Sequence, residues 1–159
     1  MDKTALRHAI LTALQAELAL QTEAANTARD EATNEESRAE DRFDMRSQSA
    51  AYLAAGQARI ASEVADAIAA YTALTVRAFR PDEPLAIGAL VALEAHGRRV
   101  WYFIGPQHGG LDVTVDGVKV TVVTGASPLG RQLVGRKVGD SAMLPGRTGA
   151  VMHAIAAVE

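Results

Sequence analysis

Acidic side chains gather at one place in the first half of the chain, between residues 30 and 44. Seven carboxylates lie in this stretch of 15 residues, namely Asp30, Glu31, Glu35, Glu36, Glu40, Asp41 and Asp44. Acidic residues at a helix start stabilise the helix because they oppose its dipole, but seven exceed what that role needs. Asp41 and Asp44 are three residues apart where a second helix is expected to begin, so they would share one face. They form the first candidate pair, and Glu36 with Glu40 forms the second.

Other reactive side chains show no recognisable constellation. The four histidines lack metal-ligand spacing and no nucleophile–base pair is evident, so each is expected at the surface or in a turn; they are His8, His96, His108 and His153. The absence of cysteine excludes disulfides and cysteine-based zinc or redox sites. Gly130 and Gly135 have the separation of a phosphate-binding loop, but Arg136-Lys137 replaces the required Lys-Ser/Thr pair.

Apolar residues follow a helical spacing on both sides of the acidic stretch. The first seam repeats at steps of four and consists of Leu6, Ile10, Leu14 and Leu18. The second consists of Phe43, Ala50, Leu53, Ile60, Val64, Ala67, Tyr71 and Leu74. The connection is short and polar and neither helix could bury its stripe alone, so antiparallel pairing is expected. We predict an antiparallel coiled-coil hairpin over residues 1–77, with its turn between Thr33 and Asp41 and the acidic residues at its tip.

The second half of the chain has the spacing of strands. Residues 78–84 contain two prolines and are predicted to be a linker. Strand-like runs follow, separated by turn pairs such as His96-Gly97 and Asp116-Gly117; the runs are 89–93, 100–104, 111–115, 118–123, 141–144 and 149–155. We predict an antiparallel sheet domain over residues 85–159, packed on one short helix. Together with the hairpin, this makes an α+β fold.

The one helix expected in this half lies between residues 126 and 140. Ser127 is a good N-cap, and the fixed φ of Pro128 suits the first helical turn. The predicted apolar stripe consists of Leu129, Leu133 and Val134. Gly135 is expected to end the helix, and Gly139-Asp140 to form a turn. On these grounds alone, capping and packing would account for the segment.

Composition narrows the class of protein. The net charge of −3 argues against indiscriminate DNA binding. No apolar run of about 18 residues is present to span a bilayer, and the N-terminal residues enter a periodic helix directly rather than a signal peptide. We expect a cytoplasmic protein with no membrane partner.

The segment from Ser127 to Asp140 resembles a signature of the bacterial Gre transcript-cleavage factors, GreA and GreB. That signature is S-P-apolar-[AG]-R-x-L-apolar-G-[KR]-x-x-x-D, and it lies in the FKBP-like C-terminal domain of the family. The layout of hairpin, acidic tip, linker and small sheet domain is similar over essentially the full length. The usual tip sequence of the family is Gly-Asp-Leu-x-Glu-Asn-Ala-Glu-Tyr. Ala39-Glu40 and Phe43 loosely resemble the end of that sequence, but its Asp-x-x-Glu pair is missing here. The resemblance therefore indicates a divergent member.

The resemblance implies a transcription elongation factor that binds RNA polymerase and enters its secondary channel with the hairpin. The tip carboxylates would help hold the second magnesium ion and stimulate cleavage of backtracked RNA near its 3′ end; these are Asp41, Asp44, Glu36, Glu40 and Glu35. Magnesium prefers hard oxygen ligands, and two-metal hydrolysis needs the second ion to orient and ionise water. The factor would have no catalytic residues of its own and no tightly bound cofactor, since the magnesium ion is shared with the polymerase.

The family's C-terminal domain docks on a coiled coil at the channel rim, through the loop that begins at Ser-Pro. By resemblance this implicates Ser127, Pro128, Leu129 and Arg131. Three alternatives stay open: a Gre-fold factor that inhibits or retunes the polymerase in the same channel, an FKBP-like prolyl isomerase, and a coiled-coil oligomerisation module. The short acidic connection favours an intramolecular hairpin, and hence a monomer.

Overall fold

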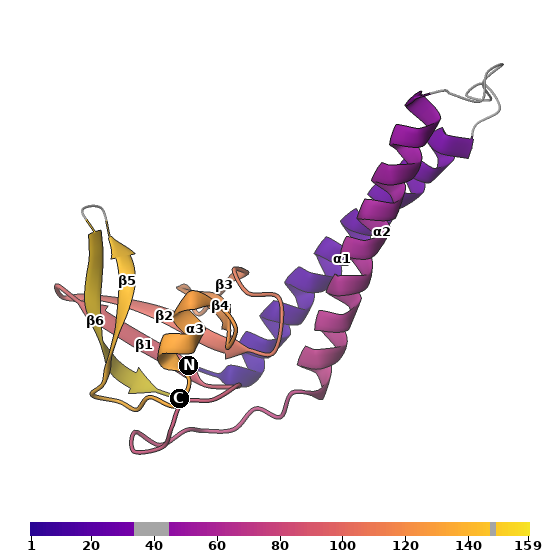
Figure 1. The fold of residues 1–159 in the computed structure, drawn as a ribbon. Helices are drawn as coiled ribbons and strands as arrows, with labels where there is room; N and C mark the ends of the chain where they lie inside the picture. The colour runs from indigo at the N-terminus through magenta and orange to yellow at the C-terminus, as the bar shows by residue number, and fades with distance from the viewer. Residues whose placement is uncertain (34–44, 147–148) are drawn as a thin grey trace. The chain divides into compact units, whose positions relative to one another are not determined.

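The computed structural model describes residues 1–33, 45–146 and 149–159. Two long helices, α1 (Lys3–Thr33) and α2 (Met45–Ala73), fill the first half, and six strands with the short helix α3 (Pro128–Leu133) fill the second (Figure 1). The predicted α+β fold class is confirmed. The chain divides into two compact units, one formed by Met1–Thr12 with Ala69–Glu159 and the other by Ala13–Ile68.

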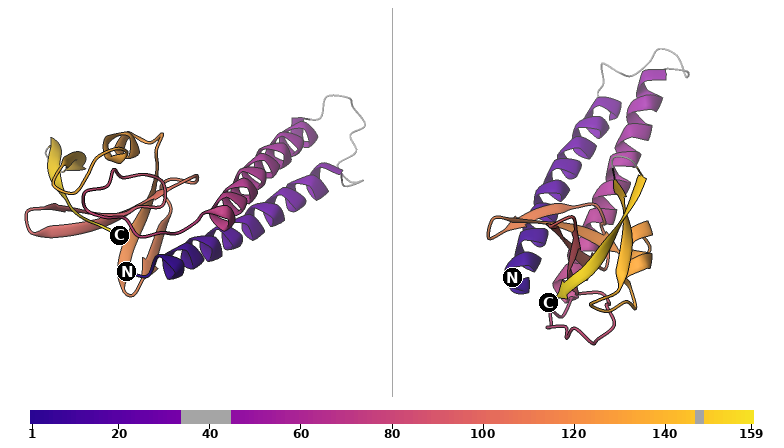
Figure 2. Two further views of the ribbon diagram at one scale, coloured as in Figure 1. Left: turned by 90° about the horizontal axis from the view of Figure 1, so that it is seen from below. Right: turned by 90° about the vertical axis from the view of Figure 1, so that its left-hand side faces the viewer.

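The unit Ala13–Ile68 consists of α1 and α2 running side by side in opposite directions (Figure 2). Leu14 from α1 and Val64 and Ala67 from α2 are buried, as the predicted seams require. Leu53 is an exception, because 55% of its surface is exposed. Gln57, a polar residue at a seam position, is half-buried. A helix of 3.6 residues per turn drifts away from a seam of strict seven-residue spacing, so α2 faces inward with different residues farther along.

The sheet has the strand order β3-β4-β2-β1-β6-β5. Its strands are β1 (Leu90–Ala95), β2 (Arg98–Gly105), β3 (Asp112–Val115), β4 (Val118–Thr124), β5 (Ser141–Gly146) and β6 (Gly149–Val158). All six predicted runs form strands, but the wholly antiparallel sheet predicted from the sequence is wrong, since β2 and β4 pair in parallel. The reason is that β3 pairs with the far side of β4, so β4 returns beside β2 in the same direction.

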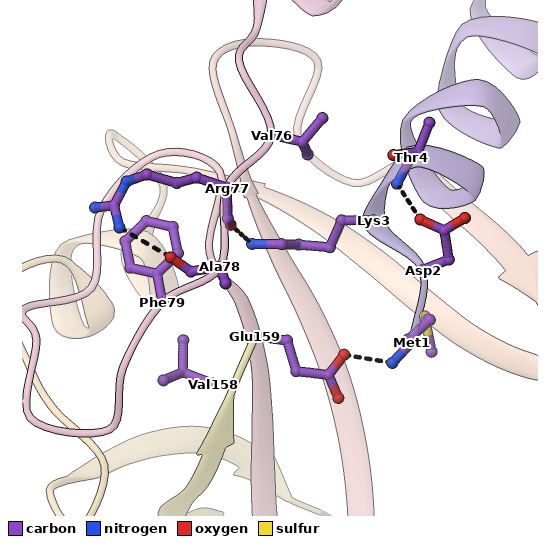
Figure 3. A pocket seen from close by; sticks show the side chains of 10 residues that line it. All are labelled: Met1, Asp2, Lys3, Thr4, Val76, Arg77, Ala78, Phe79, Val158 and Glu159. Atoms are coloured by element: carbon purple, nitrogen blue, oxygen red, sulfur yellow. Dashed lines mark hydrogen bonds and ion pairs between the residues drawn. The ribbon is translucent and has the colours of Figure 1, made fainter.

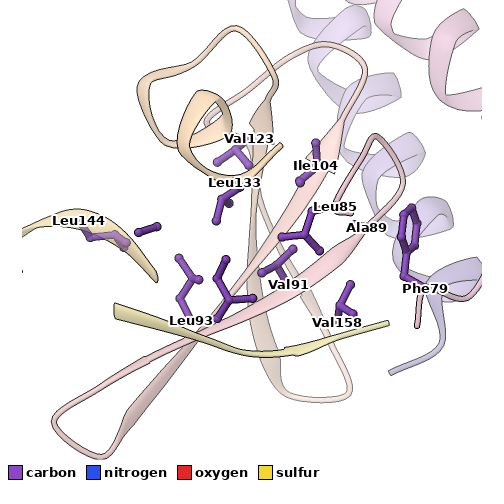
Figure 4. Packing of buried hydrophobic residues seen from close by; sticks show 12 residues of the cluster. Phe79, Leu85, Ala89, Val91, Leu93, Ile104, Val123, Leu133, Leu144 and Val158 are labelled. Carbon is purple, nitrogen blue, oxygen red and sulfur yellow. The ribbon is translucent and has the colours of Figure 1, made fainter. Parts of the chain in front are cut away.

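One face of the sheet packs against α3 around a single apolar cluster (Figure 4). Val91, Leu93 and Ile104 point into this cluster from the central strands, and Leu133 meets them from α3. Side chains alternate along a strand, so the intervening residues face the other side. These are Leu90, Ala92 and Phe103, and they are fully buried too. Both faces of the central strands are therefore covered.

Tyr71, at the end of α2, lies against the backbone of β2. A side-chain Cβ at Gly105 would be 2.0 Å from Tyr71 Oη and 2.9 Å from Val122 Cγ1. The hydroxyl donates a hydrogen bond of 3.0 Å to the carbonyl of Gln107. Burial raises the pKa of Tyr71 and keeps the phenol neutral. A glycine is needed at residue 105 because the ring occupies the space of a side chain.

Two cations at the start of α1 hold the segment that follows α2. Lys3 is only 9% exposed, and its Nζ donates to the carbonyl of Arg77 (Figure 3). The same Nζ donates to the carbonyl of Gly88 at 3.1 Å. Desolvation lowers the pKa of Lys3, with a smaller effect in the same direction from the charge of Arg77. Arg7 Nη1 donates to the carbonyl of Leu74 at 3.0 Å. The residues after α2 are thus fixed by main-chain contacts to α1.

A hollow of about 450 Å³ lies beside these contacts, between the first residues of α1 and the end of β6. The Arg77 guanidinium stacks over the ring of Phe79, 3.8 Å from its centroid. The amino group of Met1 forms an ion pair with Glu159, and its partners are drawn in Figure 3. Within the part of the chain described, no helix is long and apolar enough to cross a membrane.

Gly105→Ala should destabilise the fold, because the added methyl group collides with Tyr71 Oη and Val122. We expect a loss of about 1–3 kcal/mol in the free energy of unfolding, measured by urea titration. Gly125→Ala is the matched control, because a Cβ there meets only Val134, at an ordinary 3.7 Å. Equal stabilities of the two variants would contradict the close approach.

Candidate functional site

The candidate metal residues fall outside the part of the chain that the structure describes. Asp41 and Asp44, together with Glu35, Glu36 and Glu40, belong to residues 34–44. Helix α1 continues to Thr33, so Asp30 lies within its last turns. The described residues contain no group of three or more His, Asp or Glu side chains that could hold a metal ion. The shared magnesium site therefore stays a prediction.

The predicted docking residues belong to α3 and its N-cap. Ser127 has extended backbone angles, φ −68° and ψ 157°, and its Oγ accepts a 3.0 Å hydrogen bond from the Gly130 amide. The same hydroxyl donates to the carbonyl of Thr124 at 2.8 Å. Pro128 occupies the first turn, where its missing N–H costs nothing. The predicted cap and helix start are confirmed, and the hydroxyl of Ser127 is used internally.

Gly130 lets α3 approach β4 closely. A Cβ at this position would lie 1.8 Å from the carbonyl oxygen of Thr124, which is shorter than any real contact. The backbone of Gly130 is helical, so close approach rather than conformational freedom explains the glycine. In the sequence, this close approach is indicated only by the presence of glycine inside a helix, which costs stability and therefore needs a packing reason.

The side chains of the α3 segment divide into a buried and an exposed set. Pro128 and Arg131 are exposed, whereas Leu129 is half-buried and packs on the apolar cluster. Leu133 is fully buried, but Val134, predicted to share its stripe, is 45% exposed. Val134 has left the helix, with φ −58° and ψ 129°, so helical spacing no longer sets its direction. Within α3 itself the exposed side chains are therefore one rigid apolar ring and one cation.

An apolar groove of about 720 Å³ lies between α3 and the β5–β6 hairpin. Its side chains are mainly apolar, and they come from α3, β5, β6 and the floor of the sheet. The lining consists of Tyr102, Val123, Ser127, Pro128, Leu129, Gln132, Met143, Leu144, Pro145, Gly146, Gly149 and Ala150. Three of the four predicted docking residues line this groove, and Arg131 does not.

Sequence reasoning missed the opposite wall and the floor of the groove. Met143 and Pro145 supply the wall, and nothing local in the sequence places β5 opposite α3. Tyr102 lies in the floor, where burial raises the pKa of its phenol and the charge of Asp112 raises it further. Gln132 bridges α3 to β5 through its side-chain amide. A neutral, mainly apolar groove of this kind suits binding rather than acid–base chemistry.

No protein-family model and no curated protein matches this chain. Among solved structures, Gfh1 (GreA factor homolog 1) of Thermus thermophilus is 20% identical, covers 94% of both chains and gives a TM-score of 0.38. Gfh1 of Thermus aquaticus is 19% identical over 92% of both chains, with a TM-score of 0.39. A third structure, of the transcription factor Gfh1, is 20% identical, covers 94% of this chain and 93% of that chain, and gives 0.40. These identities and TM-scores are too low to assign an activity to this chain.

Ser127→Ala should destabilise the sheet domain by about 1 kcal/mol, because the Gly130 amide and the Thr124 carbonyl each lose a partner. Thermal unfolding followed by circular dichroism measures the change. Ser62→Ala, an exposed serine within α2, is the control and should leave the midpoint unchanged or slightly raised. A parental midpoint for Ser127→Ala would show that the cap contributes nothing.

Proposed function

We propose that this protein is a secondary-channel regulator of RNA polymerase that docks through α3 and the groove beside it. The observation that carries the proposal is the pairing of exposed Pro128 and Arg131 with an apolar groove on a helix held by internal contacts. The resemblance of the segment from Ser127 to Asp140 to the Gre signature supplies the identity of the partner.

The exposed chemistry of this surface suits a helical partner. A rigid proline ring and the half-buried Leu129 offer apolar area with little side-chain entropy to lose on binding. Arg131 adds a planar cation, and arginine is over-represented among the residues that dominate binding energy. Arg131 Nη1 donates to the carbonyl of Ala126 at 2.5 Å, so the guanidinium is held in place before a partner arrives. A coiled coil with apolar and acidic side chains would complement both features.

The length of the helices supports the proposal that they enter a channel. Helix α1 has 31 residues, which at about 1.5 Å per residue gives a length on the order of 45 Å. Residues 34–44, which include five of the seven acidic residues, follow α1 and precede α2 in the sequence. In a polymerase channel, Asp41 and Asp44 would supply oxygen ligands to a shared magnesium ion, which would activate water for RNA hydrolysis. We propose this role from residue type and position in the chain.

Cleavage of backtracked RNA tests the function directly. Halted elongation complexes are incubated with the protein and magnesium, and the RNA 3′ end is followed on a sequencing gel. Faster cleavage than by the polymerase alone supports an activator. Slower cleavage supports the inhibitor alternative, for which the missing Asp-x-x-Glu pair is the specific reason. No effect on either cleavage or elongation would refute a channel regulator.

Pro128→Ala with Arg131→Ala should weaken polymerase binding about tenfold or more, since each side chain contributes about 1 kcal/mol or more when it anchors an interface. Fluorescence anisotropy of the labelled protein measures the affinity. Arg80→Ala with Pro81→Ala is the matched control, because it removes the same two residue types from exposed positions outside the groove lining. Parental affinity of the α3 double variant would refute the docking role.

Asp41→Asn with Asp44→Asn should leave binding intact and slow stimulated cleavage by orders of magnitude, because a lost metal ligand acts on the chemical step. Added magnesium should restore part of the rate. Single-turnover cleavage measures it, with Asp66→Asn and Asp116→Asn together as a control that removes the same charge elsewhere. If the tip variant cleaves at the parental rate, Glu36 and Glu40 become the candidate pair.

A further inference from the structure

Strand β5 is an edge strand, since it ends the strand order of the sheet. Edge strands expose unpaired N–H and C=O groups to which other chains can add. On β5 the side chain of Gln132 occupies one such position. The Met143 amide donates to Gln132 Oε1 at 2.8 Å, and Gln132 Nε2 donates back to the Met143 carbonyl at 3.2 Å.

The pairing with β6 identifies which groups of β5 face outward. Met143 lies opposite Met152, and its amide and carbonyl are both engaged by Gln132, so this pair does not exchange ladder hydrogen bonds. Hydrogen-bonded and non-hydrogen-bonded pairs alternate along antiparallel strands, so Ser141 and Pro145 face the same open side. Pro145 has no N–H to offer. Of the three outward positions, one is filled by a side-chain amide and one lacks a donor.

We infer that Gln132 is a positioning residue that closes the edge of β5 and holds α3 at a fixed distance from the opposite wall of the groove. A primary amide is suited to this role because it carries a donor and an acceptor side by side, as a strand residue does. Gln132 Nε2 also lies 3.4 Å from the carbonyl of Pro128. One side chain therefore links the start of α3 to the wall of the groove.

The edge closure itself can be measured without the polymerase. Gln132→Met keeps the length of the side chain and removes both hydrogen bonds. In the full chain we expect amide exchange at Met143, followed by NMR, to become about tenfold faster. Gln107→Met is the matched control, because it makes the same change at an exposed loop position, and Met143 should exchange at the parental rate. Unchanged exchange in Gln132→Met would overturn the inference.

Gln132→Glu separates the two hydrogen bonds that the side-chain amide makes with Met143. At neutral pH the carboxylate still accepts from the Met143 amide but cannot donate to its carbonyl. We expect Met143 exchange to stay within about threefold of the parental rate, because the acceptor that protects the amide is retained. Exchange as fast as in Gln132→Met would show that an acceptor at residue 132 does not protect the Met143 amide, and would overturn the inference.

The effect on docking rests on the proposed function. In Gln132→Met, α3 is no longer held to β5, and we expect the affinity for the polymerase to fall about threefold to tenfold. Gln107→Met should bind as the parent does. If Met143 exchange quickens and the affinity does not change, the positioning role is refuted although the edge contact stands. The double variant Pro128→Ala with Arg131→Ala distinguishes failure of the positioning role from failure of the proposed function. The proposed docking is refuted only if this double variant also binds the polymerase normally.

Discussion

The contact of Tyr71 with the bare backbone of Gly105 lets the end of α2 cover one face of the sheet. Side chains alternate along a strand, so Gly105 and Phe103 share the face of β2 opposite to that of Ile104, which packs in the cluster under α3. Lys3 then ties the chain after α2 to α1 through two backbone carbonyls. Burying an ammonium group costs free energy, and these carbonyls offset that cost. The ends of the hairpin helices nearest the sheet therefore belong to the same compact unit as the groove.

The groove lies between the short helix α3 and strand β5, and polar contacts of Ser127 and Gln132 fix the position of α3. A helix of six residues has no independent stability, so its position depends on what surrounds it. Leu133 anchors it in the core, and Ser127 fixes its first turn. Together with Gln132, these contacts consume the polar groups of the segment. Pro128 and Arg131 form the exposed surface of α3. Few polar groups of this surface still need a hydrogen-bond partner within the chain.

Local patterns predicted the elements, and non-local contacts account for what they missed. Asp116 and Gly117 both adopt positive φ, 53° and 76°, as their turn signal requires, and all six strand runs were found. The parallel pairing of β2 and β4 depends on where β3 lies, which no local pattern encodes. Val134 was assigned to the helical stripe because the helix end was placed one residue too late. The contact of Gln132 with Met143 has no local signal, since the two residues are 11 positions apart on different elements.

The closed edge of β5 limits what kind of partner the groove can take. A peptide that binds as an added strand draws its affinity from main-chain hydrogen bonds along an open edge. Here the middle position is taken by Gln132, and Pro145 offers no donor, so that mode is blocked along most of β5. A partner must then be recognised through side chains, as helices are in grooves. Recognition of this kind concentrates binding energy in a few side chains, and under the proposed docking these would be Pro128, Leu129 and Arg131.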